Sequence, residues 1–409
     1  MKYLLSIVVI LLSLVSCTSP GTVAAPTLQN AEYRQSSALT EPGTIHIWTS
    51  WEGAIFERLQ QAVDVFQNTH PQMSFEIQFI PFNQISAAYR TAVENGGGPE
   101  ILIAPGSIGG ELFLSGLAAN TSPFLRSEMQ VDLQPAAISS VSWEDSLIGV
   151  PLVMSGVVMY RNASVFKSAP ATFEELKVLS AAASDKKTSV YLDGGFFFTG
   201  GHLFGLGSEL MDQEGHPELA NNRGAAWLSL IKELAEFGPL AFNSDDDLHA
   251  FLEGNTGILF DGTWNLNRIR ESLGEEKLSI DPWPAVDGRH LSGFVQTDNA
   301  YLNPIKLNTS QTASLDFLKF LISPQAQTIF LQAGQIPVHN SLDIPDPFIQ
   351  KIRSVFEGST AYPVDPVMDR YSSSLNTALQ RLLYEGWSVE DILVQAEQDI
   401  LRDLDRDYP

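Results

Sequence analysis

Aromatic side chains stand at several breaks between predicted strands and helices. They are the residues of this sequence whose type and position best fit a ligand-binding site. An aromatic face matches the apolar C–H face of a pyranose ring, and neighbouring hydroxyl, amide and carboxylate groups match its hydroxyls. For each aromatic taken alone, a loop anchor packed into a core explains the pattern equally well. The positions are Trp51, Phe196, Phe197, Phe198, Trp264 and Tyr371.

The stretch 251–266, FLEGNTGILFDGTWNL, is the most informative part of this pattern. It predicts the end of a helix, a turn, a buried strand, a glycine corner and an exposed Trp264. We expect Gly262 to adopt a backbone angle that other residues resist. The corner would present Trp264 and Asn265 at a strand end, where open α/β sheets place their ligands. Leu259 and Phe260 are assigned to the core.

The sequence motifs of common enzymes and metal sites are absent. There is no Gly-x-Ser-x-Gly, no His-Glu-x-x-His and no P-loop, and the seven histidines include no pair at i, i+4 spacing. The run Asp245–Asp247 lacks the glycine and distal glutamate of a calcium loop, and acids at a helix start favour the helix dipole. We therefore expect no metal and no cofactor. A pair of glycosidase carboxylates stays open, because their separation depends on the fold.

Length and charge limit the class of protein. A chain of 409 residues is long enough for two domains with substantial cores. Lys and Arg number 24 against 48 Asp and Glu, a formal net charge of −24, and no basic patch is visible. This argues against nucleic acid and against binding to anionic lipid. The acidity is typical of a soluble chain that does not self-associate, so we expect a monomer.

The N-terminus predicts a lipoprotein. Lys2 precedes the apolar run 4–15, which is too short to span a bilayer comfortably and ends in Leu-Val-Ser-Cys17. This end resembles a bacterial lipobox, so residues 1–16 would be a signal peptide and Cys17 the lipidated anchor. An ordinary signal peptide that is cut nearby is the alternative. Residues 17–43 are rich in small and polar residues and predict a flexible tether to the extracytoplasmic face of the membrane.

Strands and helices alternate after the tether. Strand patterns at 44–48, 74–80 and 100–104 are separated by helical patterns at 54–68 and 85–94. This order predicts a parallel sheet with crossover helices, whose break residues line one edge.

Later segments predict a second α/β unit. The extended segment 148–161 is too long for one strand and would leave one domain and enter another, and 292–304 is extended as well. A capping box of Thr172 and Glu175 opens a helix over 172–183. Further helices are predicted at 223–237, 372–384 and 389–405.

Several segments in order are similar to one family. They are IHIWTSW at 45–51, PEILIAPG at 99–106, the stretch 251–266, and LDFLKFLISPQAQTIFLQAGQIPVHNS at 315–341. The chain resembles the extracellular solute-binding proteins of maltose-binding type, which serve ATP-binding cassette importers. The resemblance implies a type II-like periplasmic-binding fold, with two α/β lobes, central mixed sheets flanked by helices, and a hinge of three chain crossings.

The resemblance also implies domain boundaries and a function. The first lobe would be 44–150 plus 294–337, and the second 151–293 plus 338–409. A sugar or oligosaccharide would bind between the lobes and close them, and the membrane permease would take it from the closed form. The protein would not be an enzyme. The alternatives are the same fold binding a polyamine, a phosphodiester or another polar metabolite, and a surface glycosidase.

The resemblance assigns the ligand site residue by residue. The loop after the third strand departs from the family pattern, because Pro105-Gly106-Ser107 stands where many members place an acid or an aromatic residue. This loop therefore offers little side chain to a ligand hydroxyl. The implied site residues are Ser50, Trp51, Glu52, Ser107, Met154, Ser155, Phe196, Phe197, Phe198, Trp264, Asn265 and Tyr371.

Overall fold

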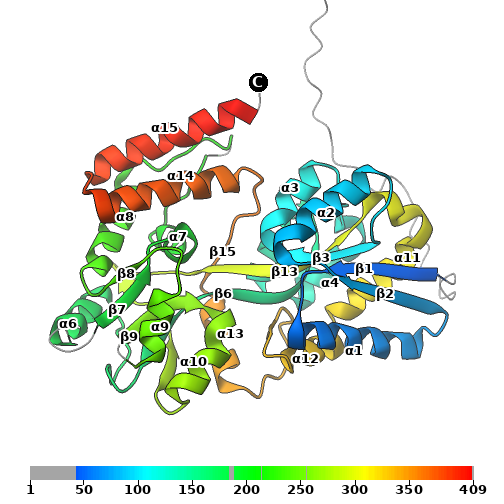
Figure 1. Ribbon diagram of the computed structural model, residues 1–409, viewed down its shortest axis with the longest axis horizontal. Coiled ribbons are helices and arrows are strands. Elements are labelled where there is room, and N and C mark those ends of the chain that lie inside the picture. The colour runs from blue at the N-terminus through cyan, green and yellow to red at the C-terminus, as the bar shows by residue number, and fades with distance from the viewer. Residues whose placement is uncertain (1–42, 184–187, 213, 255, 408–409) are drawn as a thin grey trace, which may run out of the picture.

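Two α/β lobes lie side by side and are joined by long strands. The structure is a computed structural model that describes residues 43–183, 188–212, 214–254 and 256–407. Strands β6 (Val150–Asn162) and β13 (Phe294–Leu302) run from one lobe into the other (Figure 1). The predicted α/β class is confirmed. The predicted signal peptide and Cys17 lie outside the described residues, as does the tether up to residue 42.

The first lobe begins with three parallel strands joined by helices, as the sequence predicts. Strand β1 (Gly43–Thr49) lies between β2 (Met73–Phe79) and β3 (Ile101–Pro105) and is parallel to both. Helices α1 (Gly53–Thr69) and α2 (Phe82–Glu94) make the crossovers. The carboxyl ends of the three strands therefore meet at one edge of the sheet.

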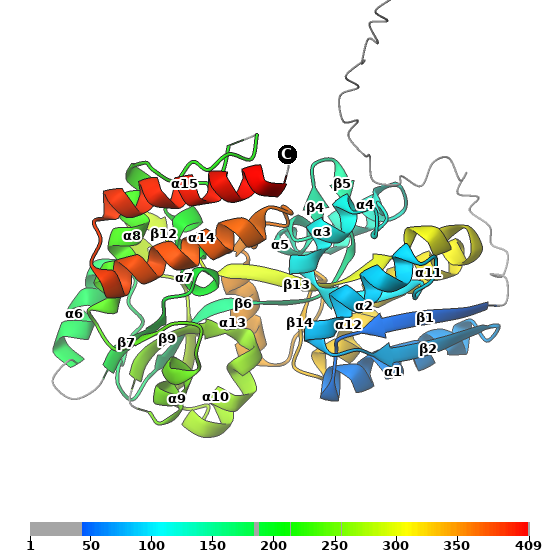
Figure 2. The ribbon, with the colours of Figure 1, turned by 45° about the horizontal axis from the view of Figure 1, so that its top comes forward.

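Further helices complete the first lobe on both sides of this sheet (Figure 2). Among the described residues, no helix combines the length and the apolar character needed to cross a bilayer. These further helices are α3 (Gly109–Leu114), α4 (Ser122–Asp132), α5 (Pro135–Ser139), α11 (Leu307–Leu321) and α12 (Pro324–Leu331).

The second lobe is built on the far half of β6. Strand β9 (Thr256–Gly262) pairs antiparallel with β6, and β7 (Thr188–Asp193) and β8 (Leu240–Ala241) follow in parallel. Strand β10 (Leu278–Asp281) adds to the other side of β6. The helices are α6 (Phe173–Ala183), α7 (Phe196–Gly205), α8 (Asn222–Ala235), α9 (Asp246–Leu252), α10 (Leu266–Leu273), α13 (Pro347–Phe356), α14 (Met368–Gln380) and α15 (Val389–Asp407).

Strand β6 changes its pairing partner in mid-strand. Up to Gly156 it pairs with β13, and from Val157 it pairs with β9. A β-carbon at Gly156 would lie 2.5 Å from the Phe294 carbonyl oxygen, so glycine is what lets the two crossing strands approach. The predicted lobe boundaries at 150/151, 293/294 and 337/338 stay predictions.

A third crossing lies beside the first. Strand β14 (Ile336–Pro337) pairs antiparallel with β6 at Met154 and Val153. The fully buried Gln327 of α12 ties the crossings together. The amide nitrogen of Gln327, Nε2, donates to the Leu152 carbonyl at 2.9 Å, and its Oε1 accepts from the Val338 N–H at 2.9 Å. Both buried backbone groups are thereby satisfied where the strand pairing is irregular.

The structure confirms the predicted cap of helix α6 and contradicts the predicted break at Phe196–Phe198. The capping interaction at α6 is present, because the Glu175 N–H donates to Thr172 Oγ1 at 3.1 Å, while the Glu175 carboxylate accepts from the Ala171 N–H at 2.7 Å. The prediction that the run Phe196–Phe198 lies in a break was wrong, because α7 begins at Phe196 and continues through Gly200-Gly201.

Candidate functional site

A row of polar side chains lies where the crossing strands meet. Every residue of β6 is buried except Ser155, and every residue of β13 is buried except Gln296 and Asp298. Ser155 and Gln296 are in register, and Asp298 lies two residues further along the same face of β13. Gln335, also partly exposed, precedes Ile336, which is opposite Met154. We call Ser155, Gln296, Asp298 and Gln335 the polar floor.

Aromatic rings of the second lobe stand beside this floor. The Phe197 ring centroid lies 6.0 Å from that of Trp264 and 5.8 Å from that of Tyr362, and Phe198 lies 6.5 Å from Trp264. Trp264 is 51% exposed, and the other three rings are partly buried. The Tyr362 N–H donates to the Val295 carbonyl at 2.7 Å, which places the Tyr362 backbone beside β13 near Gln296. We call these four rings the aromatic wall.

A cavity of about 160 Å³ joins the floor to the wall. Thr263 closes one side, because its Oγ1 accepts from the Gly156 N–H at 3.2 Å and so connects β9 to the crossing strand. We call this cavity the crossing pocket. It is lined by Met154, Ser155, Thr263, Trp264, Leu266, Asn267, Ala333, Gly334, Gln335 and Ile336.

The expected reason for glycine at position 262 was wrong. Gly262 has φ −74°, an angle that any residue adopts. A β-carbon there would instead lie 2.1 Å from the Trp264 ring, so the position needs glycine for space. The rest of the stretch matches its prediction, since β9 is buried throughout and Trp264 is exposed.

The first-lobe residues lie at the carboxyl ends of β1 and β3. Trp51 is only 5% exposed, and its indole Nε1 donates to Asp298 Oδ2 at 2.7 Å. Ser50 is partly exposed, and Glu52 is exposed just before α1. Ser107 is exposed in the short turn after β3. The structure thus brings Trp51 to the polar floor through Asp298.

Other predicted site residues have structural partners of their own. Tyr371 is fully buried, and its hydroxyl donates to the Gly215 carbonyl at 2.9 Å, so it belongs to the second-lobe core and not to the aromatic wall. Phe196 is buried between Trp227 and Phe294.

Two further predicted residues lie closer to the crossing. Asn265 is partly exposed, and its Nδ2 donates to Asp261 Oδ2 at 2.8 Å, which fixes the corner before α10. Met154 is buried but lines the crossing pocket.

Four members of the floor and the wall were not predicted. Gln296 and Asp298 lie within the predicted extended segment 292–304, and Gln335 directly precedes the short strand β14, but no local pattern distinguishes their partly exposed side chains. Tyr362 follows the two-residue strand β15 (Thr360–Ala361), which is too short to leave a pattern. A signal that could have indicated Asp298 is an acid inside an otherwise uncharged strand.

Burial raises the pKa of two carboxyl groups at or near the site, those of Asp298 and Asp261. It raises the pKa of Asp298, while the Trp51 hydrogen bond lowers it. Burial also raises the pKa of Asp261 to about 6, opposed by hydrogen bonds from the Gly262 N–H and the Asn265 amide. No Lys or Arg belongs to the floor, the wall or the crossing pocket, so the described site offers no cationic side chain to an anionic ligand.

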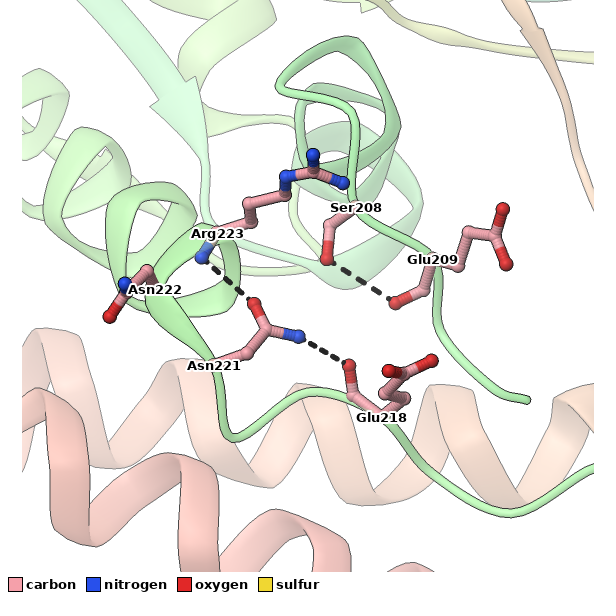
Figure 3. A pocket seen from close by; sticks show the side chains of 6 residues that line it. All are labelled: Ser208, Glu209, Glu218, Asn221, Asn222 and Arg223. Atoms are coloured by element: carbon pink, nitrogen blue, oxygen red, sulfur yellow. Dashed lines mark hydrogen bonds between the residues drawn. The ribbon is translucent and has the colours of Figure 1, made fainter.

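A larger hollow of about 360 Å³ lies on the second lobe at the start of α8 (Figure 3). Its polar groups are largely bonded within the chain. Asn221 accepts from the Arg223 N–H at 2.8 Å and donates to the Glu218 carbonyl at 2.7 Å. It contains no aromatic ring, so it lacks the combination found at the crossing.

Comparisons with known proteins point to one group. The family described as bacterial extracellular solute-binding protein matches residues 61–352. The maltooligosaccharide ABC transporter solute-binding lipoprotein of Streptococcus pneumoniae strain R6 is 26% identical over 272 residues, which are 60% of this chain and 61% of that relative. The chain therefore spans less than two thirds of that relative. The maltotriose-binding protein of Pyrococcus abyssi is 21% identical over 88% of this chain and 83% of its own length.

Solved structures agree on the fold. The sugar-binding protein MalE of Xanthomonas citri superposes with a TM-score of 0.81, at 17% identity, over 90% of this chain and 99% of that one. The two-lobe fold expected from the sequence is confirmed by this likeness.

Proposed function

The chain belongs to the bacterial extracellular solute-binding proteins, and we propose that it binds a neutral carbohydrate between its two lobes. The floor offers amides, a hydroxyl and one carboxylate for ligand hydroxyls, while the wall offers aromatic faces for the C–H faces of sugar rings. The relatives named as maltooligosaccharide-binding and maltotriose-binding proteins support α-linked glucose oligomers as the ligand class.

One observation carries this proposal. In the two strands that cross between the lobes, the partly exposed side chains are polar and lie on one face, directly beside an aromatic wall. A hinge that served only to connect the lobes would have no need of a polar row in otherwise buried strands. A ligand held there touches both lobes and therefore favours their closed arrangement over the open one.

The same proposal covers the cellular role. The chain would act as the extracytoplasmic binding component of an ABC importer, anchored to the membrane through Cys17, monomeric, and without catalysis. It would hand its sugar to the permease from the closed form. The predicted lobes, 44–150 plus 294–337 and 151–293 plus 338–409, would be the two bodies that close.

Binding assays on the full chain in mild detergent test the proposal. Maltotriose, putrescine and glycerophosphocholine represent the neutral sugar, the polyamine and the phosphodiester. A ligand at 100 times its Kd stabilises the folded state by about 2.7 kcal/mol, which a thermal-shift assay detects. We expect stabilisation by maltotriose alone. Stabilisation by either charged compound without any sugar response contradicts the proposal.

A further inference from the structure

The geometry points to Asp298 as the charged hydroxyl acceptor of the ligand site, held in place by Trp51, an inference that rests on the proposed function. Asp298 lies on β13, which runs between β3 and β6 in the sheet. It is in register with Pro105, whose loop offers only Ser107, and with Val153, two residues before Ser155. Its carboxylate therefore lies between two segments that provide only hydroxyl groups.

The bonding of Asp298 leaves one oxygen available. Oδ2 accepts the Trp51 indole N–H at 2.7 Å, and no donor to Oδ1 is found among the described residues. The side chain is partly exposed on the face that also carries Ser155 and Gln296. A carboxylate oxygen accepts a hydroxyl proton through a charge-assisted hydrogen bond, which is about twice as strong as a neutral one.

Fold stability does not account for this carboxylate. Within the described chain Asp298 has no ion-pair partner, whereas the buried Asp281 pairs with Arg161 at 2.5 Å. A carboxylate placed in a largely buried strand without a cation is costly. Its one hydrogen-bond partner within the described residues is a neutral indole, so the group is better explained by a ligand than by packing.

Trp51 has the features of a positioning residue. Its indole is buried and meets Phe330 edge-on, with the ring centroids 5.4 Å apart. Its backbone N–H donates to Thr49 Oγ1 at 3.0 Å. These contacts fix the indole N–H that orients Asp298, and they leave little of the ring to stack on a sugar.

The first test is Asp298→Asn in the full chain, with maltotriose as the probe. The amide oxygen can still accept from Trp51, but the spare position changes from a charged acceptor to a donor. We expect Kd to rise about 10- to 100-fold, with little change in the melting temperature. Asp316→Asn is the matched control, because Asp316 is a partly buried acid of the same lobe on α11, and it should leave Kd unchanged.

A double-mutant cycle separates positioning from direct contact. Trp51→Phe alone should raise Kd, but in the Asp298→Asn background it should add less than about 2-fold, because the two residues act as one unit. Equal effects of Trp51→Phe in both backgrounds would show that the ring contacts the sugar itself.

The outcomes are distinguishable. If the unmodified protein binds no sugar in the panel, the proposed function fails. If it binds maltotriose and Asp298→Asn binds equally well, the function stands and the role of Asp298 is refuted.

Discussion

The Trp264 ring lies so close to the α-carbon of Gly262 that a β-carbon there would be 2.1 Å from the ring. The corner after β9 thus sets the orientation of the exposed indole through contact with the backbone. The two residues form one unit of the aromatic wall, and each can be tested separately.

Trp264→Ala should weaken maltotriose binding while the fold remains intact. The ring is 51% exposed, so its removal costs little core packing, but it takes away the most exposed face of the wall. We expect a loss of about 2 kcal/mol in binding, roughly 30-fold in Kd, measured by calorimetry. Trp387→Ala is the control, since Trp387 is 39% exposed and packs under Arg381 outside the wall. Equal losses from both variants would contradict the assignment.

Gly262→Ala should also weaken binding, by displacing the indole. The φ angle of −74° accepts alanine without backbone strain, and the three atoms nearest to the added methyl group all belong to the Trp264 ring. We expect a rise in Kd for maltotriose and an altered Trp fluorescence spectrum, with a melting temperature close to that of the unmodified protein. Gly358→Ala, where the nearest atom is 3.9 Å away, should change neither. Unchanged affinity in Gly262→Ala would refute the packing argument.

Gln327→Ala should destabilise the chain at the hinge. The substitution removes the side-chain partner of three buried backbone groups. They are the Leu152 carbonyl, the Leu321 carbonyl and the Val338 N–H. We expect the free energy of unfolding to fall by about 3 kcal/mol, measured by urea denaturation. Gln325→Ala in the same helix is exposed and serves as the control. If the two variants lose the same stability, Gln327 does not bind the crossings together.

Asp247→Asn should change how stability depends on pH. Burial, with the nearby charges of Asp261 and Asp193, raises the pKa of Asp247 to about 7, against about 3.9 in an unfolded chain. The folded state then holds the proton more tightly, so this group lowers stability as pH rises from about 4 through about 7. The variant should therefore gain more stability relative to the unmodified protein at pH 8 than at pH 5. Thermal unfolding at both pH values measures the difference, and an equal difference would contradict the shift.

Much of the fold could be predicted because its signals are local. The strand and helix alternation before residue 105, the α6 cap and the stretch 251–266 all depend on residues close in sequence. Helix α7 was missed because Gly200 and Gly201 resemble a break. The glycines are there for space, since a β-carbon at Gly201 would lie 2.6 Å from the Gly293 carbonyl carbon.

The site was harder to predict because its floor depends on register between distant strands. Gln335, Ser155 and Gln296 become neighbours only when β14, β6 and β13 pair. Tyr371 was predicted as the late aromatic residue of the site, at a helix start. The structure instead places Tyr362, nine residues earlier, in the aromatic wall, because β15 pairs with β13. Sequence spacing alone could not separate these two tyrosines.

The division of the site between the lobes has a consequence for affinity. The aromatic wall is carried by the second lobe, whereas the carboxylate of Asp298 and its indole partner are fixed in the first-lobe part of the sheet. A sugar resting on the wall would meet the carboxylate at the high effective concentration that the tethered lobes impose. The contacts with the wall and with the carboxylate would then act together as one strong contact. Affinity would therefore depend on the stiffness of the crossing strands, and a change in that stiffness would alter Kd without changing any atom that touches the ligand.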